Sequence, residues 1–586
     1  MRKKFLAVML SLSMVFSLSA CGSNTNKPAT NDNVESTADA AGESSESDLE
    51  DIIPEETVTL DVFTQLANYS GEQIGWFAKV MLDKFNVKLN IIPDPADEGV
   101  FATRMESGNL GDIVIFGGNM DYYDQAVKQG MLFDWNEEDL LTNYGSYIKE
   151  TMSNALEHNA EISGGTTYGF GYDVAQNPAD IKGFDYHPDI RYDLYKEIGS
   201  PQIKTLEDYV DVLDKMVKAC PKSDSGKKTY GVSLFPDWDG DMVMFVKATA
   251  ALYGYEEFGF GLYNVNTQTY EDALADDGMY LRCLKFYNQL FQKGLLDPDS
   301  STQTYDNVIE DYTDGAAFMN IFAWMGAMSY NTQEHLDEGK AMLAVPADDF
   351  APIVYGCNIY GGNRIWTIGA NTEYPELCMA IINWLCTPEG AMTSEYGPEG
   401  VTWNYNADGK TEFTDLGKQT NKDGNVEMTG GYTGTFKDGK SQMNNTTWAL
   451  DAENPDSNGE TFNDEKWESE LNSEVTPIQQ DWRDFTGYAN ANEYLASRPY
   501  STVLGTTYTT SIKDDELQIV WNQIQNCIKE NSWKAIYAKD DAEYDKIVAE
   551  MKSKAKEYGY DKCVEYQQKE AEQRKACEDK VKELIK

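Results

Sequence analysis

The chain has 586 residues, which is enough for two or more hydrophobic cores. Its 98 acidic residues outnumber the 48 Lys and Arg residues and give a formal net charge of -50. This charge would repel phosphate backbones, so it argues against nucleic acid as a partner and indicates an acidic, solvated surface.

The N-terminus has the pattern of a secretory signal peptide. Basic residues 2–4 precede an apolar run from Phe5 to Leu18, which is shorter than the roughly 20 residues that a membrane-spanning helix needs. The run ends in Leu18-Ser19-Ala20-Cys21, which resembles the lipobox of bacterial lipoproteins. We therefore expect residues 1–20 to be removed and Cys21 to carry lipid on the extracellular face of the cell membrane. The alternative is an ordinary cleavage site that precedes a cysteine.

Residues 21–56 are rich in Ser, Thr, Asn, Asp, Glu and Ala and have few large apolar side chains. A segment of this composition cannot bury a core. We predict a disordered tether that holds the folded part away from the membrane.

An α/β pattern begins at Val58. Alternating apolar residues predict strands over 58–62 and 87–91, and 3–4 spacing predicts an amphipathic helix over 74–85. Strand, helix and strand in this length form a βαβ unit, which implies a parallel sheet. A buried strand over 112–116 ends at two glycines, and ligands of open α/β sheets bind beyond such strand ends.

A second α/β region follows. Helices are predicted over 206–217, 281–293 and 375–385, and strands over 230–235, 342–345 and 364–368. Residues 404–499 break into short polar and Trp-containing stretches to which we assign no element. Residues 543–585 are charged and helical, in two pieces broken near Gly559.

Several short motifs occur in an order that is similar to one family. They are Ser107–Val114 (SGxxPDIV), 130–134 (GLLxDL), 168–170 (YGLP), Arg191–Gly199 (RxDLxxxLG), 205–209 (TxxEY), 315–324 (GxxAMxxxxxW) and 388–390 (SPEG). Together they resemble family 1 extracellular solute-binding proteins, the maltose and oligosaccharide type that serves ABC importers. The resemblance is greatest to large lipoprotein members from Gram-positive bacteria. It covers 58–403 and is loose beyond that.

The resemblance implies a periplasmic-binding-protein-like α/β fold with two lobes and a cleft between them. By analogy, lobe one is 57–173 and 341–396, and lobe two is 174–340 and 397–586 with an extended C-terminal region. The same analogy places the hinge near Tyr172, Lys340 and Gly397.

A sugar site needs flat aromatic rings for apolar C–H faces and planar polar groups for hydroxyls. Candidates at the predicted strand ends are Gln65, Asn68, Tyr69, Phe116 and Asn119 in lobe one, and Asp237, Trp238, Trp324 and Trp403 in lobe two. The resemblance gives Trp324 and Trp403 the best support, although either could instead be a core residue. No basic cluster lies near these loops, which favours a neutral ligand; we interpret the nearest arginine, Arg364, as a strand-end charge.

Other kinds of site find little support. Besides Cys21 there are eight cysteines, with no C-x-x-C spacing and only three histidines, so a zinc site has little support. Export permits disulfides, but we expect buried thiols rather than a disulfide framework. Residues 404–415 imitate a calcium loop but lack Glu at its twelfth position, and a hairpin turn explains Asp408-Gly409 equally well. We predict no metal, no cofactor and no catalytic residues.

The sequence thus predicts a lipid-anchored extracellular solute-binding protein. We expect a monomer that captures an oligosaccharide in the cleft, delivers it to the permease subunits of an ABC importer, and meets the membrane only through its lipid. One alternative is a secreted glycoside-active enzyme, which would turn its ligand over. Another is a binding protein for peptides or another polar solute.

Overall fold

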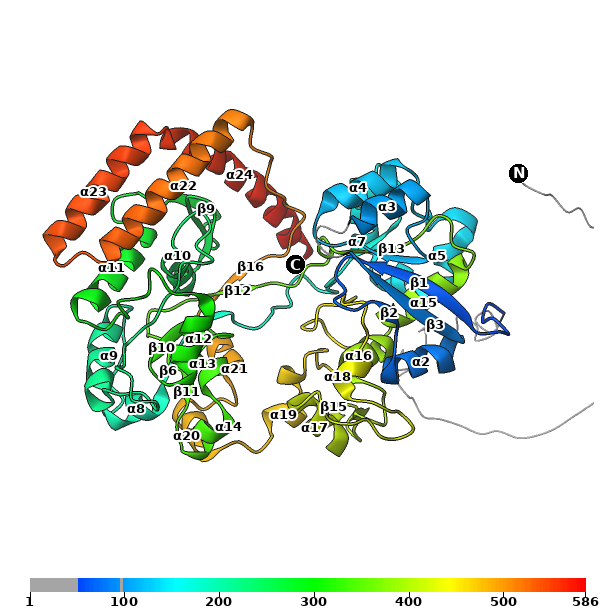
Figure 1. Cartoon of the computed structure of the whole chain (residues 1–586), viewed down its shortest axis with the longest axis horizontal. Helices are drawn as coiled ribbons and strands as arrows, with labels where there is room; N and C mark the ends of the chain where they lie inside the picture. Colours follow the sequence, from blue (N-terminus) through cyan, green and yellow to red (C-terminus); the bar gives the residue numbers. More distant parts are fainter. Residues whose placement is uncertain (1–50, 95–98, 586) are drawn as a thin grey trace, which may run out of the picture. The chain divides into compact units, whose positions relative to one another are not determined.

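The computed structural model describes residues 51–94 and 99–585 (Figure 1). The predicted signal peptide, Cys21 and most of the predicted tether lie outside the described residues. The last tether residues, 51–56, contact the fold: Ile52 packs against the first core, and the Asn86 side-chain amide donates a hydrogen bond to the Pro54 carbonyl (2.8 Å). The ordered part therefore begins before residue 57.

Lobe one is built on a six-stranded sheet. Its strand order is β2 (Gly71–Glu72), β3 (Val87–Pro93), β1 (Val58–Thr64), β4 (Ile113–Ile115), β13 (Ile365–Ile368) and β5 (Gly169–Gly171). Strand β1 pairs in parallel with both β3 and β4, so the predicted βαβ unit is confirmed. Strand β13 runs antiparallel between β4 and β5.

Helices cover this sheet. They are α2 (Gly75–Phe85), α3 (Val100–Ser107), α4 (Met120–Lys128), α5 (Leu140–Tyr144), α6 (Ser146–Thr151), α7 (Ser153–Ile162), α15 (Pro375–Cys386) and α16 (Pro388–Tyr396). Three fully buried tryptophans, Trp76, Trp135 and Trp366, fill the core. Burial of such large apolar side chains is the main favourable term in holding the layers together.

The segment after α16 also belongs to lobe one. It contains β14 (Trp403–Tyr405), β15 (Thr411–Phe413), α17 (Asp415–Lys422), α18 (Phe436–Gly439) and α19 (Glu468–Leu471). Trp403, Trp448 and Trp467 from this segment are buried in the same core as α2. The Trp76 indole N–H also donates to the Phe436 carbonyl (2.9 Å). The structure therefore moves the boundary that we placed at 397, because these aromatic side chains are buried against lobe one.

Lobe two has a central three-stranded sheet in which β6 (Tyr186–Arg191) is antiparallel to both β10 (Met319–Phe322) and β11 (Met342–Ala344). Because β11 pairs here, lobe two extends past residue 341. A second antiparallel sheet contains β7 (Tyr255–Glu257), β8 (Gly261–Asn264) and β9 (Thr269–Asp272). The surrounding helices include α8 (Tyr192–Glu197), α9 (Asp208–Ala219), α10 (Met244–Ala250), α11 (Met279–Gln292), α12 (Tyr305–Thr313) and α20 (Pro477–Thr486).

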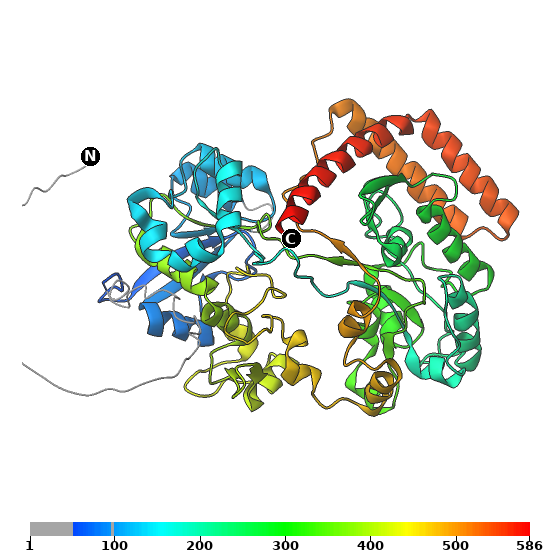
Figure 2. The same cartoon turned by 180° about the vertical axis from the view of Figure 1, so that it is seen from behind.

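Three long helices complete lobe two: α22 (Asp515–Ile536), α23 (Asp541–Glu557) and α24 (Tyr560–Leu584). Figures 1 and 2 show them, coloured orange to red, alongside α11 and β9. The Tyr544 hydroxyl donates to the Leu281 carbonyl (3.1 Å), and Trp521 is buried in the lobe-two core. Gly559, with φ of +95°, separates α23 from α24, as the predicted break requires.

The chain passes between the lobes through residues 172–185, 346–364 and 472–476. Strand β12 (Ile353–Tyr355), in the second passage, pairs in parallel with β16 (Ser501–Val503). The Cys357 amide donates to the Asp180 carbonyl (2.8 Å), which joins the first two passages. Of the three expected hinge positions, only Tyr172 adjoins a passage: Lys340 precedes β11 of lobe two, and Gly397 lies inside lobe one.

Two further sequence expectations concern thiols and membrane spans. The eight cysteines of the described region are free thiols, six of them buried and two, Cys220 and Cys577, partly exposed. Among the described helices none is both long and apolar enough to cross a bilayer.

Candidate ligand-binding site

Lobe two contains a pocket of about 470 Å³ that we call the aromatic pocket. Its walls come from β6, β7, β10, β12 and α10. Its aromatic side chains are Tyr186, Trp238, Tyr255, Phe322, Trp324 and Tyr355, and its charged side chains are Asp185, Lys247, Glu256 and Glu257. The pocket thus combines flat apolar surfaces with hydrogen-bond acceptors, which is the chemistry that a hydroxyl-rich ligand requires.

Trp238 is the most exposed of the aromatic side chains that line the aromatic pocket. Its exposed fraction is 47%, and its ring stacks on Tyr305 at a centroid distance of 4.7 Å and an interplanar angle of 27°. Trp324 lies 6.0 Å from Trp238 and 5.0 Å from Phe322, again between ring centroids. Because aromatic neighbours hold Trp238 in place, it offers a rigid platform at low entropic cost.

Lys247, Glu256 and Glu257 of the pocket are held by specific partners. The buried Lys247 ammonium donates to the Asp239 carbonyl (2.9 Å) and pairs with Glu257. Glu256 pairs with Arg574 of α24. Burial raises the pKa of Glu256, and the neighbouring Arg574 charge opposes that rise. The Glu256 carboxylate is thus a positioned acceptor whose charge depends on the C-terminal helix.

Asp185 and Trp324 extend the site beyond this pocket. Both also line a second cavity of about 540 Å³, together with Phe184 and His187. The two cavities therefore adjoin at these two side chains.

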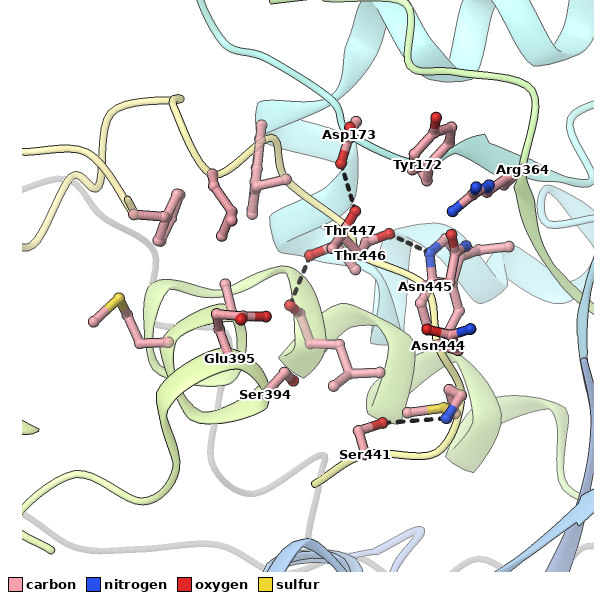
Figure 3. Close-up of a pocket in the computed structure, with 18 of the residues that line it drawn as sticks. Tyr172, Asp173, Arg364, Ser394, Glu395, Ser441, Asn444, Asn445, Thr446 and Thr447 are labelled. Carbon is pink, nitrogen blue, oxygen red and sulfur yellow. Dashed lines mark hydrogen bonds between the residues drawn. The ribbon is translucent and has the colours of Figure 1, made fainter. Parts of the chain in front are cut away.

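Lobe one contains a different cavity, also of about 470 Å³, which we call the polar pocket (Figure 3). It lies between α16, residues 440–450, Tyr172 and the start of β13. Its polar side chains are Tyr172, Asp173, Arg364, Ser394, Glu395, Lys440, Ser441, Asn444, Asn445, Thr446 and Thr447.

Hydrogen bonds fix the floor of the polar pocket. The Thr446 hydroxyl donates to Asp173 (2.6 Å), the Trp366 indole donates to the Thr446 carbonyl (2.7 Å), and the Thr447 hydroxyl donates to the Leu385 carbonyl (3.0 Å). These bonds keep residues 444–447 in place against α15 and β13.

The lobe-one candidates from the sequence lie elsewhere. Gln65 donates to Asp94 (2.9 Å) and accepts from the Gly117 amide (2.9 Å), and the Tyr69 hydroxyl donates to the Glu72 carbonyl (2.7 Å). Asn119 caps α4 by accepting from the Asp121 amide, and Asn68 is exposed. Phe116 is fully buried against Phe101 and Tyr123, so it has no surface to offer a ligand. None of these five candidates lines the polar pocket.

Of the lobe-two candidates, the structure brings Trp238 and Trp324 together. Asp237 is exposed beside them and accepts from the Tyr305 amide (3.0 Å). Trp403 is fully buried in lobe one, where its indole donates to the Gly397 carbonyl (2.7 Å). We therefore remove Trp403 from the candidate site, because its ring packs against protein on all sides.

Sequence reasoning missed the polar pocket. Nine of its twenty lining residues fall in 440–450, where no apolar periodicity marks an element. The run Asn444-Asn445-Thr446-Thr447 before Trp448 has the composition of a surface loop, so the sequence gives no signal that marks it as the wall of a pocket.

The calcium-like stretch forms a hairpin. Strands β14 and β15 pair antiparallel, and Asn406 accepts from the Asp408 and Lys410 amides across the turn. Within residues 51–94 and 99–585, no group of three or more His, Cys, Asp or Glu side chains is arranged to hold a metal ion.

Residues 70–392, more than half of the chain, match the family model described as bacterial extracellular solute-binding protein. The chain therefore belongs to this family, and the family expectation from the sequence is confirmed. Members are non-enzymatic components of transporters and act outside the cell, so the protein is a solute-binding protein rather than an enzyme.

Individual relatives are distant. Lipoprotein LipO of Bacillus subtilis (strain 168) is 21% identical over 306 residues, which are 51% of this chain and 52% of LipO. The match thus spans about half of that relative's length.

Solved structures match over most of the chain. The Streptococcus pneumoniae ABC-transporter substrate-binding protein FusA, in complex with kestose, has a TM-score of 0.52 at 16% identity, over 88% of this chain and 99% of that chain. An extracellular solute-binding protein from Bifidobacterium longum subsp. infantis scores 0.53 at 14% identity, over 88% and 98%. The alginate-binding protein AlgQ2 scores 0.53 at 16% identity, over 89% and 99%. These similarities confirm the two-lobed α/β fold class.

Proposed function

We propose that this protein is a lipid-anchored receptor that captures an oligosaccharide and delivers it to the permease of an ABC importer. The observation that carries the proposal is the half-exposed Trp238, stacked on Tyr305 beside Trp324 and the pocket carboxylates. Sugar rings stack their C–H faces on such platforms while their hydroxyls donate to carboxylates.

The chemistry favours saccharide over peptide as cargo. An extended peptide is bound mainly through its main chain, at an exposed strand edge, whereas this pocket presents ring faces and carboxylates. Two structures of similar fold carry saccharides in their names, kestose for FusA and alginate for AlgQ2. The family assignment supports an importer as the partner.

The polar pocket of lobe one is the second half of the proposed site. Solute-binding proteins with two lobes close on their ligand by a hinge motion, and residues 172–185, 346–364 and 472–476 are the connections between the lobes. We expect the ligand to meet the aromatic pocket with one face and the polar pocket with the other.

The lipid anchor is proposed from Leu18 to Cys21. The lipoprotein relative LipO supports it. A diacylated cysteine would hold the protein firmly, since each buried CH₂ contributes about 0.8 kcal/mol.

A ligand screen tests the function. The purified full chain is heated with individual neutral and acidic oligosaccharides; a true ligand at about a hundred times its Kd stabilises the fold by about 2.7 kcal/mol. Mass spectrometry of the recovered saccharide should show it unchanged. Stabilisation by peptides alone, or cleavage of the saccharide, would contradict the proposal.

A further inference from the structure

Arg364 differs from the other arginines of the described residues. The guanidinium groups of the others hydrogen-bond or pair with protein groups: Arg104, Arg191, Arg282, Arg483, Arg498 and Arg574. Within residues 51–94 and 99–585, the Arg364 guanidinium has neither a hydrogen bond nor an ion pair, and it lies over the Tyr172 ring at 4.8 Å from the centroid. Even in a chain with a net charge of -50, the described residues supply this guanidinium with neither a carboxylate nor any other acceptor.

The Asn445 side chain likewise has no hydrogen-bond partner among the described residues. Both polar atoms of its side-chain amide are buried without a hydrogen-bond partner. Its neighbours are anchored: the Asn444 amide donates to the Leu66 carbonyl (2.6 Å), and Thr446 is bonded to Asp173 (2.6 Å). Asn445 is thus fixed in position with its own amide unsatisfied, and buried amides in folded proteins nearly always find a partner.

Both groups line the polar pocket, and Figure 3 draws the Arg364 guanidinium turned toward Asn445. The carboxylates of the pocket already have partners. Asp173 accepts from Thr446 and lies 3.5 Å from the Lys182 ammonium, and Glu395 pairs with Lys440 (2.7 Å). The uncompensated charge of the pocket is therefore that of Arg364.

We propose that the polar pocket binds a carboxylate, so that the cargo is an acidic oligosaccharide containing a uronic or sialic acid unit. This inference rests on the proposed function. The planar guanidinium matches a carboxylate with two parallel hydrogen bonds, and the Asn445 amide donates a third while its oxygen accepts a sugar hydroxyl. An acidic cargo replaces the neutral ligand that we expected from the sequence, where we interpreted Arg364 as a strand-end charge.

Matched saccharides and variants test the assignment. The probes are trigalacturonate, trimannuronate and sialyllactose, each paired with its carboxyl-reduced neutral form and titrated calorimetrically into the full chain. We expect at least one acid to bind more tightly than its reduced partner. The Arg364→Gln variant should weaken that acid about tenfold to a hundredfold, as expected for loss of a charge-assisted bond, and change the neutral form less than about twofold.

Two further variants sharpen the test. Asn445→Asp is nearly isosteric and should exclude the acid by repulsion while leaving the reduced form bound. Lys293→Gln removes one exposed positive charge from lobe two and should change neither, so it controls for net charge. Each variant is first shown to melt as a folded protein.

The outcomes separate this inference from the proposed function. If reduced saccharides bind as well as the acids, or the preference for acid survives Arg364→Gln, the carboxylate assignment is wrong and the oligosaccharide receptor stands. If no saccharide binds, acidic or neutral, then both the proposed function and the carboxylate assignment are wrong.

Discussion

Arg574 of α24 and Glu256 of β7 form an ion pair across 318 residues of sequence. Glu256 lines the aromatic pocket, while Arg574 lies well beyond residues 70–392, the part that matches the family model. Arg574 also bonds Glu578 (2.9 Å) and lies over the Tyr263 ring at 4.1 Å. The C-terminal helix therefore positions an acceptor of the pocket, which gives this extension a role in the site.

Replacing Arg574 with Met should destabilise the protein at pH 7. The change leaves the buried Glu578 and the partly buried Glu256 beside each other without a cation. Breaking a fully buried pair costs about 3–5 kcal/mol, and the partial exposure of Glu256 places this pair toward or below the lower end of that range. Burial already raises the pKa of Glu256 above 4.5, and loss of Arg574 raises it further. A carboxyl whose folded pKa lies above its unfolded value stabilises the fold below the unfolded pKa, and that stability is lost as pH rises through the folded pKa.

The free energy of unfolding in urea at pH 4.5 and at pH 7 checks this prediction. The deficit of Arg574→Met should be smaller at the lower pH, where Glu256 takes up a proton. Lys575→Met is the control, because the Lys575–Asp579 pair is exposed and surface pairs contribute about 0–1 kcal/mol. A deficit of equal size at both pH values would contradict the assignment to Glu256.

The anchor prediction concerns Cys21. Replacing it with Ala should abolish lipid attachment, because the thiol of this residue is the proposed acceptor. Cells that produce the protein are labelled with a radioactive fatty acid, and the immunoprecipitated protein is counted. Cys220→Ala, at a partly exposed thiol, should keep the label. Label in Cys21→Ala, or none in the wild type, would show that the lipobox resemblance is misleading.

Ligand binding should draw the two lobes together. The passages between them, 172–185, 346–364 and 472–476, are segments in which changes of a few backbone dihedrals can produce a hinge motion. Small-angle scattering of the full chain should give a smaller radius of gyration with saturating saccharide. A variant that does not bind should show no change with the same saccharide. An unchanged radius for the saturated wild type would mean that binding occurs without closure.

Local pattern predicted much of the fold. The alternation over 58–62 and 87–91 and the helical spacing over 74–85 specified a βαβ unit, and β1, α2 and β3 form it. Residues 404–499 could not be assigned, because their short elements have no periodicity. Trp448 and Trp467 hold the first part of this stretch to lobe one through tertiary packing, which no local pattern encodes.

The site was predictable only in part. Trp238 was identified from its position after a strand-like run and Trp324 from the family motif, and they meet in one pocket. Phe116 also follows a strand-like run and Trp403 has the same family support as Trp324, yet both are fully buried, because neither signal reveals which side chains remain exposed. The contribution of Arg574 depends on a contact between residues 318 positions apart, so nothing near Glu256 in the sequence could indicate it.

Substitution of individual tryptophans distinguishes residues that bind the ligand from residues that stabilise the core. Trp238→Ala should weaken saccharide binding by about 1–3 kcal/mol, roughly tenfold to a hundredfold in Kd. Because its side chain is 47% exposed, the free energy of unfolding should change little, and Trp238→Tyr should restore most of the affinity by keeping a stacking ring. Trp324→Ala should also weaken binding.

Trp403→Ala should behave in the opposite way: removing a fully buried ring costs about 3–5 kcal/mol of stability, while the molecules that remain folded should bind with wild-type affinity. Calorimetric titration and urea unfolding of the four variants measure both quantities. Wild-type affinity in both Trp238→Ala and Trp324→Ala would remove these rings from the site, whereas lost affinity in folded Trp403→Ala would mean that the lobe-one core, rather than the exposed platform, controls recognition.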